Sequence, residues 1–155
     1  VQEKLKKQGA YLVEYTPPRP KVMEHWAYPG VRVMRELGLI EGGYANDYGL
    51  ERKVAKWSLE NKLNKVLRLA HERNPRVPLR RVEIPMEVTG KEMVKAAAWG
   101  LTGEKLSFPE ALALLKEKGL LNGELEAKFT DWQEVPDFAR MLCLLANLYE
   151  YLLKQ

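Results

Sequence analysis

Histidine is the side chain best suited to acid–base or metal chemistry near neutral pH, and this chain has only two, His25 and His71. They lie far apart in the sequence, and neither belongs to a metal-binding pattern such as His-Glu-x-x-His. We expect His25 to cap or pack the helix that follows it, and His71 to lie near a helix end, where a positive charge suits the helix dipole. The sequence therefore predicts no metal site and no histidine catalyst.

The carboxylates are placed for structure rather than for catalysis. General acid–base chemistry needs two carboxylates in different environments that face one cleft. Most acidic residues here lie among lysines, as in residues 116–118, which is typical of a solvated helix face. Asp47, Asp131 and Asp137 lie near expected turns or helix starts, where a carboxylate accepts hydrogen bonds from free backbone amides. We expect no catalytic residue among them.

The hydroxyl and thiol groups form no nucleophile motif, and no Gly-x-Ser-x-Gly sequence is present. Ser58 is expected on a helix surface, and Ser107, with Glu110 three positions later, is expected to cap a helix. The single cysteine, Cys143, excludes an internal disulfide and a cysteine-based zinc site. Its apolar neighbours predict a small core residue.

Aromatic side chains are the remaining candidates for a binding site, because they serve as sugar platforms as well as core residues. The four tryptophans are Trp26, Trp57, Trp99 and Trp132. The helical spacing around Trp57 favours core packing over a sugar platform. Trp132, which follows Asp131, is expected to be a surface aromatic.

The charge of the chain is mildly basic, with 25 basic and 21 acidic residues and a net charge of +4. The one basic cluster consists of Arg73, Arg76, Arg80 and Arg81. It lies in a proline-containing stretch without interleaved aromatic residues, which favours a solvated linker over a phosphate-binding arm. We expect no nucleic-acid partner.

The composition is that of a globular protein, with 46% hydrophobic and 30% charged residues. No stretch approaches the ~20 apolar residues that cross a bilayer, so we expect a soluble chain without a membrane span. The sequence starts at Val1 without an initiator Met or a signal core, as expected of a piece of a longer polypeptide. A cytoplasmic or an exported location then depends on what precedes it.

Two segments far apart in the chain share one order of residues. The first has a helical pattern from Tyr28 to Gly38, with Pro29 at its opening, and continues through residues 39–43 as Leu-Ile-Glu-Gly-Gly. The second runs from Phe108 to Gly119 and continues as Leu-Leu-Asn-Gly. This similarity predicts an internal repeat of a helix–glycine–helix unit, and therefore a mainly α fold.

The similarity extends into a second helix of each unit. Aligning Gly42 with Gly123 without gaps pairs Tyr48 with Phe129, Val54 with Val135, Trp57 with Phe138, Leu63 with Leu144 and Leu67 with Leu148. Between the units, residues 80–84 fit a short extended run, and Thr89 with Glu92 predicts a capping box for a helix from Gly90 to Trp99. This helix looks like the second half of a middle unit whose first helix has become a linker.

These patterns divide the chain into an N-terminal part, residues 1–20, and a helical repeat domain, residues 21–155, with units at about 25–71, 72–100 and 107–155. In the N-terminal part, residues 1–8 are expected to form a short helix and Ala10 to Tyr15 a short strand. Residues 16–20 are expected to form a proline-rich connector.

The pattern of His25-Trp26-Ala27, an apolar helix, Gly38-Leu39-Ile40-x-Gly42, Tyr48 and a second helix resembles the S-layer homology repeat. Three units are usual in that family, whose second helix typically opens with Ile-Thr-Arg-Ala-Glu. The arginine and its neighbours serve binding to a secondary cell-wall polymer. The resemblance implies an S-layer homology-like helical bundle.

The arginine of that motif is missing from all three corresponding stretches, which begin at Val54, Val88 and Val135. A cell-wall polymer anchor therefore remains the alternative function rather than the main one, because the cation best suited to bidentate binding of an anion is absent. If cell-wall polysaccharide binds, we expect a groove near Lys56, Lys91 or Trp132.

A second resemblance covers residues 2–9, the short strand, the proline-rich link and His25 to Gly42. This order is similar to the C-terminal region of bacterial FAD-dependent oxidoreductases, in which a glycine-rich fold in the preceding half holds the flavin. This chain has no Gly-x-Gly-x-x-Gly. The resemblance thus implies a non-catalytic accessory domain without a cofactor of its own. FAD would belong to the parent protein, and the partner would be the parent's catalytic half or another protein.

Overall fold

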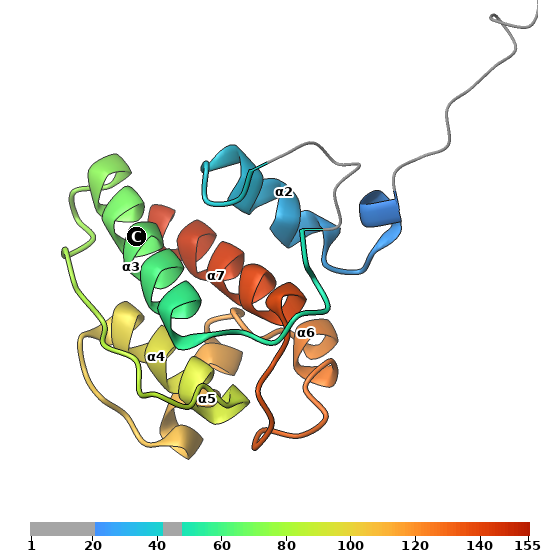
Figure 1. Cartoon of the computed structure of the whole chain (residues 1–155). Coiled ribbons are helices and arrows are strands. Elements are labelled where there is room, and N and C mark those ends of the chain that lie inside the picture. Colours follow the sequence, from blue (N-terminus) through green and yellow to red (C-terminus); the bar gives the residue numbers. More distant parts are fainter. Residues whose placement is uncertain (1–20, 42–47) are drawn as a thin grey trace, which may run out of the picture.

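The computed structural model describes residues 21–41 and 48–155 and is mainly helical, as predicted (Figure 1). A short 3-10 helix, η1 (Lys21–Glu24), precedes α2 (Tyr28–Glu36), α3 (Lys56–Arg73), α4 (Gly90–Thr102), α5 (Phe108–Glu117), α6 (Gly123–Ala127) and α7 (Phe138–Leu153). No strand forms within these residues, where the isolated antiparallel bridge between Lys53 and Asp137 is the only β pairing. The expected N-terminal helix, strand and connector lie outside the described residues, as do Gly42, Gly43 and Asp47.

Both predicted glycine turns have the geometry that the sequence requires. Gly38 and Gly119 adopt left-handed conformations, with φ of 75° and 80°, which favour glycine because they crowd a Cβ atom. After α2, Leu39 N–H donates to Met34 C=O at 3.0 Å, and after α5, Leu120 N–H donates to the carbonyl of Leu115 at 2.9 Å. These bonds satisfy carbonyls that the helix ends leave open.

The predicted start of α5 is confirmed, whereas that of α4 is confirmed only in part. Ser107 and Glu110 form a complete capping box, and their hydrogen bonds lower the pKa of Glu110. Thr89 accepts a hydrogen bond from the Glu92 backbone, but the Glu92 side chain lies 4.0 Å from Lys95 instead of closing the box.

Three long helices, α3, α4 and α7, run in the same direction and form the centre of the fold (Figure 1). Backbone hydrogen bonds join the segments that precede them. Val54 N–H donates to Pro136 C=O at 2.9 Å, and Gly90 N–H donates to Glu134 C=O at 2.9 Å. The three helix N-termini consequently meet at one end of the bundle, which we call the N-terminal end.

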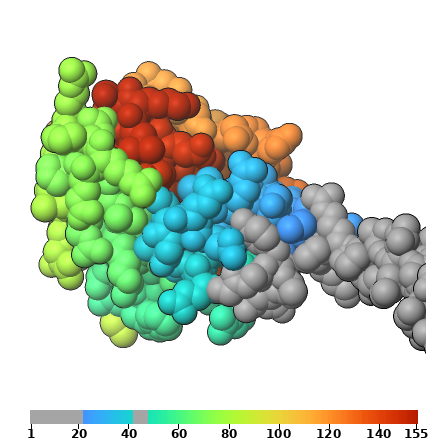
Figure 2. Space-filling model, turned by 90° about the horizontal axis from the view of Figure 1, so that it is seen from above, coloured from blue at the N-terminus to red at the C-terminus, as the bar shows by residue number. Residues whose placement is uncertain are grey.

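Each outer helix packs on a central helix that is not the second helix of its own predicted unit. α2 packs on α7, and α5 packs on α4. The space-filling view shows α2 on the surface against α7 (Figure 2). α2 and α7 approach closely because Gly30 has no side chain, and a Cβ atom there would lie 2.9 Å from the Cα of Cys143.

An extended segment, residues 77–88, packs along α3. The side chain of Asn64 accepts from Val82 N–H at 2.7 Å and donates to Val82 C=O at 2.9 Å, and Glu60 accepts from Ile84 N–H at 3.0 Å. Val82 and Ile84 are buried. The predicted extended run at 80–84 is thus an extended chain that α3 side chains satisfy, without a strand partner.

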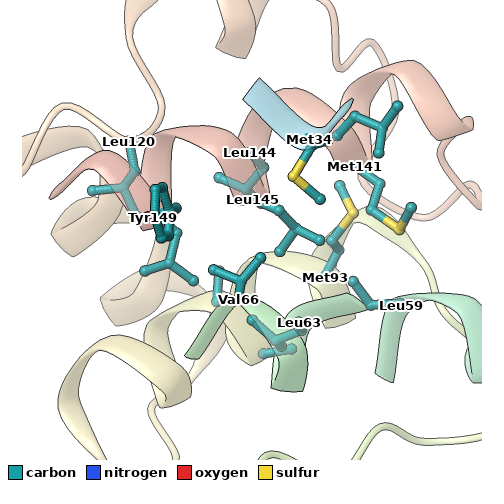
Figure 3. Close-up of a cluster of buried hydrophobic side chains, with 14 of the residues drawn as sticks. Met34, Leu59, Leu63, Val66, Met93, Leu120, Met141, Leu144, Leu145 and Tyr149 are labelled. Atoms are coloured by element: carbon teal, nitrogen blue, oxygen red, sulfur yellow. The ribbon is translucent and has the colours of Figure 1, made fainter. Parts of the chain in front are cut away.

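The core is a layered cluster of leucine and methionine side chains (Figure 3). Leu59, Met93 and Met141, from α3, α4 and α7, lie together near Met34 of α2 (Figure 3). Further along the bundle, Leu63 lies opposite Leu145 (Figure 3). Each central helix therefore contributes its apolar face to one shared interior.

Burial places the two second helices one residue out of the predicted register. The buried α3 residues Leu59, Leu63, Val66, Leu67 and Ala70 correspond best to Met141, Leu145, Leu148, Tyr149 and Leu152, which are all buried. The predicted pairing of Leu63 with Leu144 would instead place Leu59 on Arg140, which is half-exposed. The gap-free pairing therefore does not describe the burial of the helices, and α2 packs on α7 and α5 on α4 rather than each on the second helix of its own unit.

The close approach of α2 and α7 gives a stability prediction. Gly30→Ala should destabilise the fold by about 1–3 kcal/mol, because the new methyl group meets the backbone of α7. The matched control is Gly123→Ala at the start of α6, where no atom lies within 4 Å of the added carbon. The control should be neutral or stabilising by up to about 1 kcal/mol. Urea unfolding measures both, and equal effects would contradict the predicted contact.

Candidate functional site

Two of the three predicted groove residues lie together. Lys91 N–H, at the start of α4, donates to Trp132 C=O at 3.1 Å. The Lys91 ammonium lies 5.6 Å from the ring centre of Phe108, whose ring lies 5.5 Å from that of Trp132. Lys56, at the start of α3, belongs to neither contact. Lys91 and Trp132 therefore lie in one cation–aromatic cluster with Phe108 of α5, a residue that the sequence did not indicate.

Trp132 is not the free surface aromatic that the sequence predicts. Its ring is half-buried and stacks on Phe129, with centres 4.6 Å apart and planes 13° apart. Phe108 contacts it at a tilted angle of 59°. Phe129 lies only three residues before Trp132, whereas Phe108 is distant in sequence and brings α5 against the ring. Much of this ring surface serves packing between the α6–α7 loop and α5.

A groove with a volume of about 940 Å³ lies instead at the start of α3. We call it the α3 groove. Its walls come from the end of α2 (Gly38, Leu39), from residues 48–55 and from the first turns of α3 (Trp57, Ser58, Lys62, Lys65), with Phe138 of α7. Lys56 does not line it. The groove therefore opens at the N-terminal end of the bundle.

The prediction that Trp57 packs in the core is wrong. Its side chain is 72% exposed, whereas its predicted counterpart Phe138 is half-buried. Trp57 lies in the first turn of α3, on the side away from the buried residues Leu59, Leu63 and Val66, which recur at three- and four-residue steps and face the core. An exposed indole at the mouth of a groove is suited to contact a ligand or partner.

The prediction that Ser58 lies on the helix surface is also wrong, because Ser58 is buried. It is 2% exposed, and its hydroxyl has no hydrogen-bond partner. Leaving a buried hydroxyl unpaired costs about 1–3 kcal/mol. Since Ser58 lines the α3 groove, this polar group lies on the groove wall.

Two lysines of the groove have no carboxylate partner. Lys62 is half-buried, and its ammonium lies 5.2 Å from the ring centre of Phe138. Burial, and then the charge of Lys65, lower the pKa of Lys62 below its ordinary value. None of the ion pairs within the described residues includes Lys62 or Lys65. The groove wall thus carries uncompensated positive charge.

The start of α3 also differs from the starts of the other central helices. The side chain of Thr89 caps α4, and that of Asp137 caps α7, but Ala55 at the N-cap of α3 offers no side-chain acceptor. The first amides of an α-helix lack intrahelical partners and favour negative charge. The missing cap is readable in the sequence, and it is the signal that sequence reasoning overlooked.

Both histidines have the structural roles that the sequence predicts. His25 accepts from Ala27 N–H at 3.0 Å just before α2, and its other ring nitrogen lies 3.3 Å from Glu51. His71, in the last turn of α3, lies 2.6 Å from Val77 C=O, to which its Nδ1–H donates. These contacts hold the segments that flank α2 and α3.

The predicted solvated arginine cluster is partly structural. Arg73 donates to the hydroxyl of Tyr149 at 2.6 Å, and Arg80 donates to the carbonyl of Leu101 at 3.0 Å, near the end of α4. Only Arg76 and Arg81 are exposed without such a bond to a distant element. Two of the four cations are therefore fixed to the helix bundle.

Cys143 lies in a smaller groove of about 540 Å³ between α2, α6 and α7. Burial raises the pKa of its thiol to about 11, so it is a neutral thiol at neutral pH. A neutral, largely buried thiol is a poor nucleophile. This agrees with the predicted packing role of Cys143.

The described residues hold no group of three or more His, Cys, Asp or Glu side chains able to bind a metal ion. Within the same ranges, no helix is both long and apolar enough to cross a membrane. The turn glycines Gly38 and Gly119 follow helices as C-caps. They do not follow a strand as a dinucleotide-binding loop does, so these residues do not fit FAD.

Comparison of the chain with protein-family models gives no match, and comparisons with curated proteins and with solved structures give none either. Inference about function therefore comes from the residues and their geometry.

The unpaired hydroxyl of Ser58 gives a prediction with an unusual sign. Ser58→Ala should stabilise the fold by about 1 kcal/mol, because it removes a buried polar group without a partner. The same change at Ser107 should destabilise it by about 1 kcal/mol, because it removes a helix cap. Thermal unfolding at pH 7 compares the two. A loss of stability in Ser58→Ala would mean that the hydroxyl is satisfied in solution.

Proposed function

We propose that this chain is a non-catalytic interaction module that serves a larger protein. The observation that carries the proposal is Trp57, a large aromatic residue that is 72% exposed at the mouth of the α3 groove. Tryptophan is enriched among the residues that carry most of the binding energy at protein interfaces. The groove lining combines apolar groups with four cationic side chains against two carboxylates, an excess of positive charge that suits the binding of a partner.

The fold supports this role because it fixes the binding surface rigidly. The N-terminal end of the bundle is held by backbone hydrogen bonds between the segments before α3, α4 and α7. A surface built on such elements loses little conformational entropy on binding. The module would thus present a preformed end to its partner.

For the larger protein, we propose an FAD-dependent oxidoreductase of which this chain is the C-terminal part. The support is the sequence pattern of residues 2–42, which is similar to that family. The flavin would belong to the preceding half, since the described glycines of this chain serve as helix caps. A coding sequence that continues upstream into a Gly-x-Gly-x-x-Gly after a strand would agree with this parent, and one without it would exclude the parent.

Binding to the preceding half of the parent can be measured directly with separately produced halves. Trp57→Ser should weaken the complex about 30-fold, as expected for a central aromatic anchor. Met86→Ser is the matched control, because Met86 is 84% exposed but does not line the α3 groove. Isothermal titration calorimetry measures both. Equal weakening by the two changes, or no complex with the unchanged module, would contradict the proposed interaction.

A cell-wall polymer anchor is the second candidate, and the cluster of Lys91, Phe108 and Trp132 favours it. Aromatic rings beside a cation suit an anionic sugar. This function predicts that the chain co-sediments with purified cell walls. Lys91→Gln should lower the bound fraction several-fold relative to Lys95→Gln on the same helix, because Lys95 does not contact the aromatic cluster. No sedimentation of the unchanged chain would exclude the anchor.

A further inference from the structure

Three unfavourable features coincide at the first turns of α3. The helix begins at Ala55 without a side-chain cap, and the hydroxyl of Ser58 is buried without a partner. Lys62 and Lys65 repel each other on the same groove wall, and neither has a carboxylate partner. Each feature has its own cost, and one ligand would relieve all three.

We propose that the α3 groove is an oxyanion-binding site, in which a phosphate or carboxylate group caps the N-terminus of α3. The group would accept hydrogen bonds from the amides of Lys56 and Trp57 and from the Ser58 hydroxyl, since the amides of Ser58 and Leu59 already donate to Ala55 C=O at 3.1 Å. The ammonium groups of Lys62 and Lys65 would supply the balancing charge. This inference goes beyond the interaction module proposed above, because it names the chemistry that the groove recognises.

The charges that face the groove favour an anion. Its walls carry four cationic side chains, Arg52, Lys53, Lys62 and Lys65, two carboxylates, Glu41 and Glu51, and the histidine His25. Glu51 lies 3.3 Å from His25, so one carboxylate already has a polar partner. The remaining excess of positive charge lies beside the helix N-terminus, where the dipole adds to it.

The arrangement of the three central helices strengthens this field. Their N-termini meet at one end of the bundle, and their dipoles point the same way. Asp137 caps α7 and forms an ion pair with Arg140 at 2.6 Å, so Arg140 neutralises most of its charge. Thr89 caps α4 without adding charge. A bound anion would therefore be stabilised most at the N-terminus of α3, which has no side-chain cap.

The site does not depend on the position at which the S-layer homology pattern has its arginine. That position is Lys56, which does not line the groove. The residues of the proposed site are instead Ser58 and the lysines one and two turns later on α3. Trp57, at the mouth, would contact whatever carries the anionic group.

An NMR titration of the ¹⁵N-labelled chain tests the site, with sodium phosphate and sodium acetate as probes and sodium chloride at matched ionic strength as the reference. The expected result is saturable shifts of the backbone amides of residues 56–59 and of the Trp57 indole. The phosphate and acetate arms distinguish a phosphate source from a carboxylate source. Shifts of equal size with chloride, or shifts spread over the whole chain, would overturn the proposal.

Variants then assign the site to its residues. The double change Lys62→Gln and Lys65→Gln should weaken oxyanion binding at least about tenfold, while Lys118→Gln, an exposed lysine after α5, should leave it unchanged. Ser58→Ala should weaken binding about fivefold even though it stabilises the free chain, and this combination separates the site from a folding effect. Unchanged affinity in both groove variants would overturn the proposal. The titration needs no partner protein, so its result stands apart from that of the interaction experiment.

Discussion

The backbone hydrogen bonds between the segments before α3, α4 and α7 are the constraint on which the other features depend. Residues 50–54 pair with residues 136–139, and the start of α4 pairs with residues 132–134. These bonds force three helix N-termini to one end and set the three helices parallel. Parallel helices need long connections, which the chain supplies as residues 74–89 between α3 and α4 and as residues 103–137, with α5 and α6, between α4 and α7. The α3 groove and the aromatic cluster both lie at this end for the same reason.

Local rules predicted those parts of the fold that local interactions decide. Pro29, Gly38 and Gly119 bound their helices as expected, and Ser107 with Glu110 closes a capping box. Each of these depends on residues within one helical turn. The sequence therefore sufficed for helix ends and for the mainly α class.

Features decided by contacts between distant elements were predicted less well. Trp57 and Ser58 are adjacent, yet the indole lies in solvent and the hydroxyl in the interior. Which face of α3 is buried depends on its packing against α7 and residues 77–88. Neighbouring residues of a helix point in different directions, so Ser58 faces inward and Trp57 outward. Arg73 and Arg80 were assigned to solvent because their partners, at Tyr149 and at the end of α4, are remote in sequence. Lys91 contacts Trp132 while Lys56 takes part in neither contact, because the fold rather than the sequence spacing decides which of these residues are neighbours.

Polar side chains of α3 satisfy the backbone of the extended segment, residues 77–88. An outer helix satisfies its own backbone, whereas an extended chain needs external partners. Asn64 supplies both a donor and an acceptor to Val82, and Glu60 supplies an acceptor to Ile84. α3 therefore uses polar residues on the face that meets this segment and leaves Lys62 and Lys65 for the groove. α3 thus satisfies part of the backbone of its neighbour, yet no side chain caps its own first turn. The Ser58 hydroxyl is enclosed without a partner beside the α3 groove. Local conflicts of this kind are typical of functional sites, because binding rather than folding resolves them.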